Sequence, residues 1–173
     1  MKAFLKEVAV YNRKADESLG KILSPLSDDQ LNKETGTWYR SIRGTMEHIT
    51  LSFLLWLKRY DHFQAFPSLK GSPLIRRDIN QIKASLFEDP RRFLELMKET
   101  DELVVDFIDD PEEEIWGTMF RYKNIKGEEL ERTFWKTLFH VLNHGTHHRG
   151  EISAMLDQQK IPNDFSGFTA YMI

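Results

Sequence analysis

Four of the six histidines in this chain lie in the short stretch HVLNHGTHHRGE, which runs from His140 to Glu151. Residues on a helix advance roughly 100° each, so positions four apart share a face. His140, His144 and His148 therefore form one stripe, while His147 points away and is expected to meet solvent or an interface. An i, i+4 histidine pair brings two imidazole nitrogens close enough to hold one ion, as in the HExxH zinc helix. The spacing indicates a candidate metal site, although chance or a polar core would produce the same pair.

A metal ion needs a further protein ligand from a facing helix, and His48 is the candidate. It lies beside Met46 and Ile49 in an apolar helical segment, where a neutral imidazole without a polar partner is costly to bury. The alternative is that His48 donates a hydrogen bond to a backbone carbonyl or to a carboxylate such as Glu151. The residues alone leave both interpretations open.

Four helical segments must position these side chains. Each repeats apolar residues at intervals of three and four, as an amphipathic helix does; the segments are residues 4–23, 41–60, 89–110 and 133–159. The third is expected to begin with Asp89 as its N-cap and Pro90 at its first helical position. A short turn at SPLSDDQL, capped by Ser27, separates the first two. These helices predict an all-α four-helix bundle, whose core is a common place for inward-facing metal sites.

The connections between the helices differ in character. A long connection joins the second and third helices, and its first part, HFQAFPSLKGSPL, is rich in the Pro and Gly of a linker. Before the last helix, Trp116, Met119, Phe120 and Tyr122 favour extended structure and NIKG supplies a turn, which predicts a small β-hairpin. With no internal repeat, residues 1–173 are expected to form a single domain.

Composition narrows the classes of function. The chain has a net charge of -3 and a pI near 6.1, so it has no excess of basic residues such as nucleic-acid binders carry. No nucleic-acid partner is therefore expected. No stretch approaches the roughly 20 apolar residues of a membrane span, and the first residues do not resemble a signal peptide, so we expect a cytoplasmic protein with no membrane partner. The absence of cysteine excludes thiolate ligands and a thiol nucleophile from the protein itself. Any thiol chemistry must use the sulfur of a cosubstrate.

The chain resembles the DinB-like family, also called YfiT-like. The resemblance is carried by TMEHITLSFLLW on the second helix and HVLNHGTHHRGEI on the last. Two shorter motifs add to it: LSDDQLNK, which precedes the second helix, and YKNIKGE, which precedes the last. It implies a four-helix bundle that is commonly a homodimer and binds zinc, nickel or a similar divalent ion through three histidines. Carried over onto this chain, those metal ligands are His48, His144 and His148.

Three neighbouring residues raise further expectations. The family usually reads HHRGQ, whereas this chain has Glu151, which could orient an imidazole, accept a proton, become a fourth ligand or remain an exposed helix carboxylate. Arg149 is a candidate to bind an anionic substrate group, with an internal salt bridge as the alternative. Gly150 costs about 1 kcal/mol in a helix interior, so we expect a backbone or ligand to approach it closely.

Three neutral imidazoles leave an ion its charge and at least one open coordination position, which is typical of a catalytic site. Such an ion can lower the pKa of a bound thiol or water, or polarise a carbonyl. The resemblance implies a transferase that uses a low-molecular-weight thiol, of the bacillithiol or mycothiol type, on an electrophilic small-molecule substrate. The alternatives are a metal-dependent hydrolase with Glu151 as base, and a non-catalytic, stress-associated bundle in which Glu151 or His140 completes the coordination.

Overall fold

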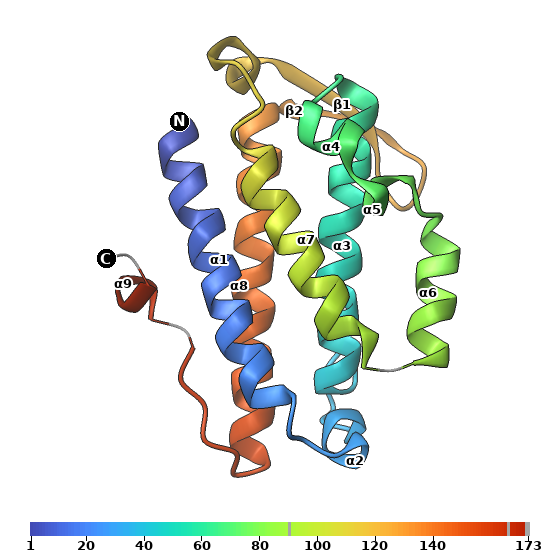
Figure 1. Ribbon diagram of the computed structural model, residues 1–173, viewed down its shortest axis with the longest axis vertical. Helices are drawn as coiled ribbons and strands as arrows, with labels where there is room; N and C mark the ends of the chain where they lie inside the picture. Colours follow the sequence, from blue (N-terminus) through green and yellow to red (C-terminus); the bar gives the residue numbers. More distant parts are fainter. Residues whose placement is uncertain (90, 166, 172–173) are drawn as a thin grey trace.

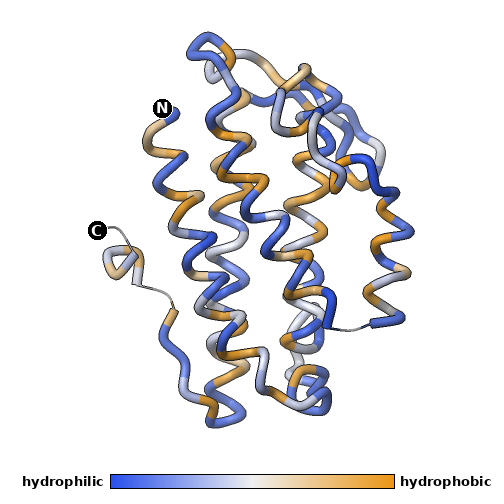
Figure 2. The backbone as a smooth tube through the Cα atoms, in the orientation of Figure 1, coloured by the Kyte–Doolittle hydropathy of each residue, from blue (hydrophilic) through white to orange (hydrophobic). Residues whose placement is uncertain are grey.

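Four long helices form the body of the molecule (Figure 1). A computed structural model of the chain describes residues 1–89, 91–165 and 167–171. The long helices are α1 (Lys2–Leu23), α3 (Ile42–Phe63), α7 (Arg92–Phe107) and α8 (Phe134–Gln158). Hydrophobic residues recur along each of them (Figure 2), and their buried side chains make one core. The prediction of an all-α four-helix bundle is confirmed.

The order of the helices in space brings the histidine segments together. Helix α1 packs against α7 and α8, and α3 packs against the same two helices. In Figure 1, α1 and α8 run in one direction, and α3 and α7 run in the other. The pairs α1–α7 and α3–α8 are therefore antiparallel, and the two helices that carry the candidate ligands are direct neighbours.

The long connection between α3 and α7 is present, but it is largely helical. It contains α4 (Pro67–Gly71), α5 (Pro73–Arg76) and α6 (Ile79–Glu88), and α6 runs back beside the bundle (Figure 1). The expectation of a Pro/Gly linker was wrong because Pro67 and Pro73 each occupy the first position of a short helix, where a missing N–H costs nothing. Asp78 then caps α6 by accepting hydrogen bonds from the amides of residues 80 and 81.

Helix α7 begins later than the sequence predicted. Its first residue is Arg92 and its N-cap position is Arg91, which makes no side-chain capping bond. Asp89, the expected N-cap, instead accepts a hydrogen bond from the Arg91 amide. The expected first helical residue, Pro90, lies outside the described residues.

The smaller elements follow the predicted pattern more closely. Ser27 and Gln30 form a reciprocal capping box at the start of α2 (Asp28–Asn32). Strands β1 (Met119–Lys123) and β2 (Glu129–Thr133) form the antiparallel hairpin. Trp116 is not extended but lies in the 3-10 helix η1 (Glu113–Gly117), where its buried ring packs against Phe134 of α8.

The last described element is α9 (Phe168–Tyr171), and its Phe168 and Tyr171 rings pack against Tyr11 of α1. Among the residues that the structure describes, no helix combines the length and the apolar character that a membrane crossing requires.

Candidate metal centre

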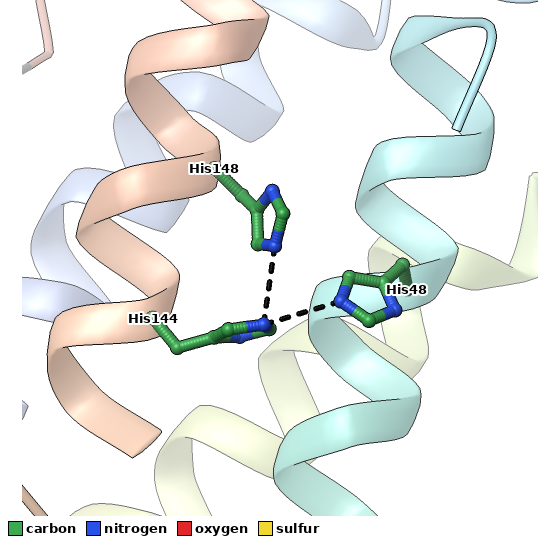
Figure 3. A group of neighbouring side chains, drawn as sticks. All are labelled: His48, His144 and His148. Carbon is green, nitrogen blue, oxygen red and sulfur yellow. Dashed lines mark hydrogen bonds between the residues drawn. The ribbon is translucent and has the colours of Figure 1, made fainter. Parts of the chain in front are cut away.

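Three imidazoles meet between α3 and α8. His144 and His148 lie one turn apart on α8 and face His48 on α3 (Figure 3). The Nε2 atom of His144 lies 3.2 Å from Nε2 of His48 and 3.1 Å from Nε2 of His148. One ligand atom from each of the three residues lies within 4.8 Å of the other two. The three side chains expected to bind metal are thus brought to one point.

The spacing of these nitrogens fits a metal ion better than it fits hydrogen bonds alone. A tetrahedral ion with Zn–N bonds of about 2.0–2.1 Å holds neighbouring nitrogens about 3.3 Å apart. Without an ion, His144 Nε2 carries at most one proton, which cannot point at both His48 and His148. If His148 donates its Nδ1 proton elsewhere, its Nε2 presents a lone pair to the same point. A cation at this point would satisfy all three lone pairs together.

The surroundings favour the neutral form of two of the rings. Burial, followed by the nearby His148, lowers the pKa of His48 to about 4, although Glu151 opposes this shift. Burial and the same neighbour lower the pKa of His144 to about 4. Metal binding requires unprotonated imidazole, so both residues are ready to bind an ion at neutral pH without first losing a proton.

Glu151 holds His148 in place. Its Oε2 atom lies 2.7 Å from His148 Nδ1, and its Oε1 atom lies 3.3 Å from Nε2 of His147. A carboxylate accepting from Nδ1 fixes the tautomer in which Nε2 is free for a metal. Of the roles considered for Glu151, this contact supports orienting an imidazole.

Tyr39 is a part of this site that the sequence reasoning missed. Its ring stacks on His48 with centroids 3.9 Å apart and planes 16° from parallel, and it meets the edge of His148. Burial and the nearby Glu151 carboxylate raise the pKa of Tyr39, so the phenol stays neutral. The residue lies in the segment TGTWYR, which looks like an ordinary loop and gives no local signal of contact with α3.

Comparison with known proteins places the chain in a family. A sequence profile described as "DinB family" matches residues 1–159. The chain belongs to the DinB family. It is 26% identical over 158 residues to a curated relative, "Protein DinB" of Bacillus subtilis (strain 168), and the match covers 91% of this chain and 87% of the relative. No solved structure matches the chain significantly.

The other residues singled out in this DinB-family chain lie around the three histidines. His140 shares their stripe, but it is exposed, and its ring lies 6.0 Å from that of His144 and 5.8 Å from that of Trp56. His147 is exposed, as expected, and pairs with Glu151. His140 is not part of the convergent group, whereas His147, His148 and Glu151 form a second, more exposed group of possible ligands.

Arg149 and Gly150 follow His148 on α8, and the first is buried whereas the second is exposed. The guanidinium of Arg149 is buried and forms a salt bridge with Asp16 of α1, 3.1 Å from Nη1 to Oδ2. No part of the chain that the structure describes approaches Gly150 closely, because a Cβ there would meet none of its atoms within 4 Å. The tightly packed glycine of α8 is instead Gly145, where a Cβ would lie 3.1 Å from the Phe53 ring.

Replacing Glu151 with alanine is expected to weaken metal binding about 10- to 100-fold, because His148 loses the partner that fixes its tautomer and orientation. Glu151→Gln keeps an acceptor for Nδ1 and should retain most of the affinity. His147→Ala, which removes the exposed partner of the same carboxylate, is the matched control. Competition with a chromophoric chelator measures all three, and wild-type affinity in Glu151→Ala would contradict the orienting role.

Gly44 is expected to tolerate no side chain. A Cβ there would lie 2.2 Å from the backbone oxygen of Tyr39, so Gly44→Ala must displace the segment that stacks Tyr39 on His48. We expect the free energy of unfolding to fall by about 1–3 kcal/mol. Gly150→Ala, at an open helical position, should instead be neutral or stabilising by up to about 1 kcal/mol. Urea denaturation of both variants checks this, and equal stability of the two would refute it.

Proposed function

We propose that this protein holds one divalent ion, zinc or nickel, on His48, His144 and His148 and acts as a metal-dependent transferase. Its cosubstrate would be a low-molecular-weight thiol of the bacillithiol or mycothiol type, and its substrate an electrophilic small molecule. The observation that carries the proposal is the convergence of three Nε2 atoms, which no fourth histidine or carboxylate joins among the described residues. A three-nitrogen site with room for an exchangeable ligand is typical of catalytic centres.

A divalent ion bound to neutral imidazoles would act as a Lewis acid that lowers the pKa of a thiol in the open position. The chain contributes the geometry. His48 and His144 stay neutral because burial lowers their pKa, Glu151 fixes the tautomer of His148, and Tyr39 packs against His48. In the transfer step the thiol loses its proton to solvent, its sulfur bonds to the electrophilic carbon, and the leaving group departs with its electron pair.

The position of Glu151 favours a thiol over water as the nucleophile. A hydrolase would need a general base beside the water, and Glu151 was the candidate. One of its oxygens is bonded to His148, and the other lies 3.3 Å from Nε2 of His147. A thiol needs less assistance, since its ordinary pKa of about 8.5 is already close to neutral. The absence of cysteine is compatible with a thiol that arrives as cosubstrate.

The test begins with elemental analysis and X-ray absorption spectroscopy on protein without a histidine tag, before and after reconstitution with zinc or nickel. We expect about one ion per chain with three imidazole ligands. The loaded protein should then accelerate conjugation of bacillithiol to a model electrophile over the metal-free control. Bound metal without thiol-dependent rate would favour the non-catalytic bundle, and turnover of esters without thiol would favour the hydrolase.

We further propose that the protein is cytoplasmic and forms a homodimer, since the family resemblance implies a dimer. Light scattering coupled to gel filtration tests the assembly directly. A dimer should show twice the 20.5 kDa mass of the chain, and a monomer at all concentrations would contradict it.

A further inference from the structure

A second concave site lies on another side of the bundle from the histidines. Helices α1 and α7 lie side by side (Figure 1), and a groove of about 460 Å³ runs between them. Its wall includes Gly20, Leu94 and Met97, and three acidic residues line it, of which Asp16 and Asp101 are buried and Glu17 is exposed. The three histidines lie between α3 and α8, so this groove is separate from the candidate metal centre.

The charges beneath the groove do not balance. Asp16, Asp101 and Arg149 are 1%, 6% and 2% exposed, and Arg149 is bonded to Asp16. One buried cation therefore faces two buried carboxyl groups. Among the residues that the structure describes, the Oδ1 atom of Asp16 has no hydrogen-bond partner, and the Asp101 side chain makes no hydrogen bond or ion pair. A buried carboxylate without a partner is unfavourable by several kcal/mol in general, so this arrangement calls for a proton or a cation.

Among the described residues, no basic side chain at the rim forms a hydrogen bond or an ion pair with Asp101, although the charge of Arg13 acts on it from a distance. Arg13 lies 3.7 Å from Glu17, its own neighbour on α1, and Lys98 pairs with Glu102 on α7. Lys21 is exposed at the solvent edge. Burial, and next the Asp16 carboxylate, raise the pKa of Asp101 well above its usual range. In the absence of a cationic ligand, Asp101 therefore tends to hold a proton.

We infer that this groove binds a small organic ammonium ion, with Asp101 accepting its N–H groups and the apolar wall of Gly20, Leu94 and Met97 covering its alkyl chain. An ammonium group offers three donors and the positive charge that the buried cluster lacks. Methylene groups suit the apolar wall. A metal ion fits less well, because the oxygens of Asp16, Asp101 and Glu17 do not gather into a group of possible ligands. This site does not depend on the proposed transferase activity.

The experiment is a titration of the whole protein with n-butylammonium chloride, followed by NMR at the Gly20 amide and the Met97 methyl group. We expect saturable shifts at both reporters. Asp101→Asn, which keeps the shape and removes the charge, should weaken binding about 10- to 100-fold. Glu102→Gln changes the exposed neighbour on the same helix and should leave binding unchanged.

Three results would overturn the inference. They are no saturable shift beyond that given by sodium chloride at equal ionic strength, equal binding in Asp101→Asn, or equal binding of neutral n-butanol. The same titration on His144→Ala separates this site from the metal centre. Butylammonium binding that persists in that variant supports an independent site even if no metal or thiol activity is found, whereas its loss there would contradict independence.

Discussion

Replacing His144 with alanine is expected to abolish high-affinity metal binding. The Nε2 atom of His144 is the shared neighbour of the other two ligands, at 3.2 Å from His48 and 3.1 Å from His148. Removing it leaves two imidazoles on different helices with no ligand between them. We expect the affinity to fall by more than about 100-fold, which exceeds the usual effect of removing an orienting partner. Chelator competition on tag-free protein measures the affinity, and any thiol-transfer rate should fall with it.

The control for this prediction is His140→Ala, one turn earlier on the same face of α8. Its ring lies 6.0 Å from that of His144 and outside the convergent group. The variant should bind metal as the wild type does and keep its stability, since the side chain is exposed. If both variants lost the ion equally, the ligand set would have to include His140, and the centre would be closed instead of open.

Replacing Arg149 with methionine is expected to destabilise the fold by about 3–5 kcal/mol, the usual cost of leaving a buried charge without its partner. Arg149 donates hydrogen bonds to Asp16 and Asn12 of α1 and to Thr146 of α8. The variant therefore removes these hydrogen bonds between α8 and α1. Such a loss is a large share of the 5–15 kcal/mol that stabilises most domains. Urea denaturation should show a lower midpoint with an unchanged slope.

Two further variants separate charge from packing in this prediction. Asp16→Asn combined with Arg149→Met removes both charges and should recover part of the lost stability, because neither partner is then left unpaired. Arg77→Met breaks an exposed pair with Glu99 and should change stability little. A loss in Arg149→Met no larger than in Arg77→Met would show that the buried pair is not important for stability.

The periodicity of the sequence was sufficient to predict the four helices and the pair His144 and His148, because both depend on the helical repeat alone. His48 was identifiable because a lone imidazole in an apolar segment needs a partner. Tyr39 was not, since its position depends on a loop with Arg40 at φ 69° and on the close approach of Gly44. These contacts are tertiary and leave no mark in local spacing.

The helical repeat also could not predict which glycine of α8 packs closely against another helix. It gives the angle between Gly145 and Gly150, but the face that meets another helix is decided by packing against Phe53 and Asn12. Asp16 lies 133 residues from Arg149, so no short-range pattern could have paired them. The helical connection α4–α6 was missed because a proline that ends one helix and a proline that begins another look the same in sequence.

The separation of the ligands along the chain has a consequence for biosynthesis. His48 and His144 are 96 residues apart, and α8 is the last of the long helices to be made. The loop between them must close before the three nitrogens can meet, so the centre is absent from a nascent chain that ends before α8. A chain that ends before α8 has only His48 of the three, and a misassembled complete chain would present at most the i, i+4 pair of α8. If the three histidines hold an ion as proposed, its retention would mark a correctly folded molecule that includes α8.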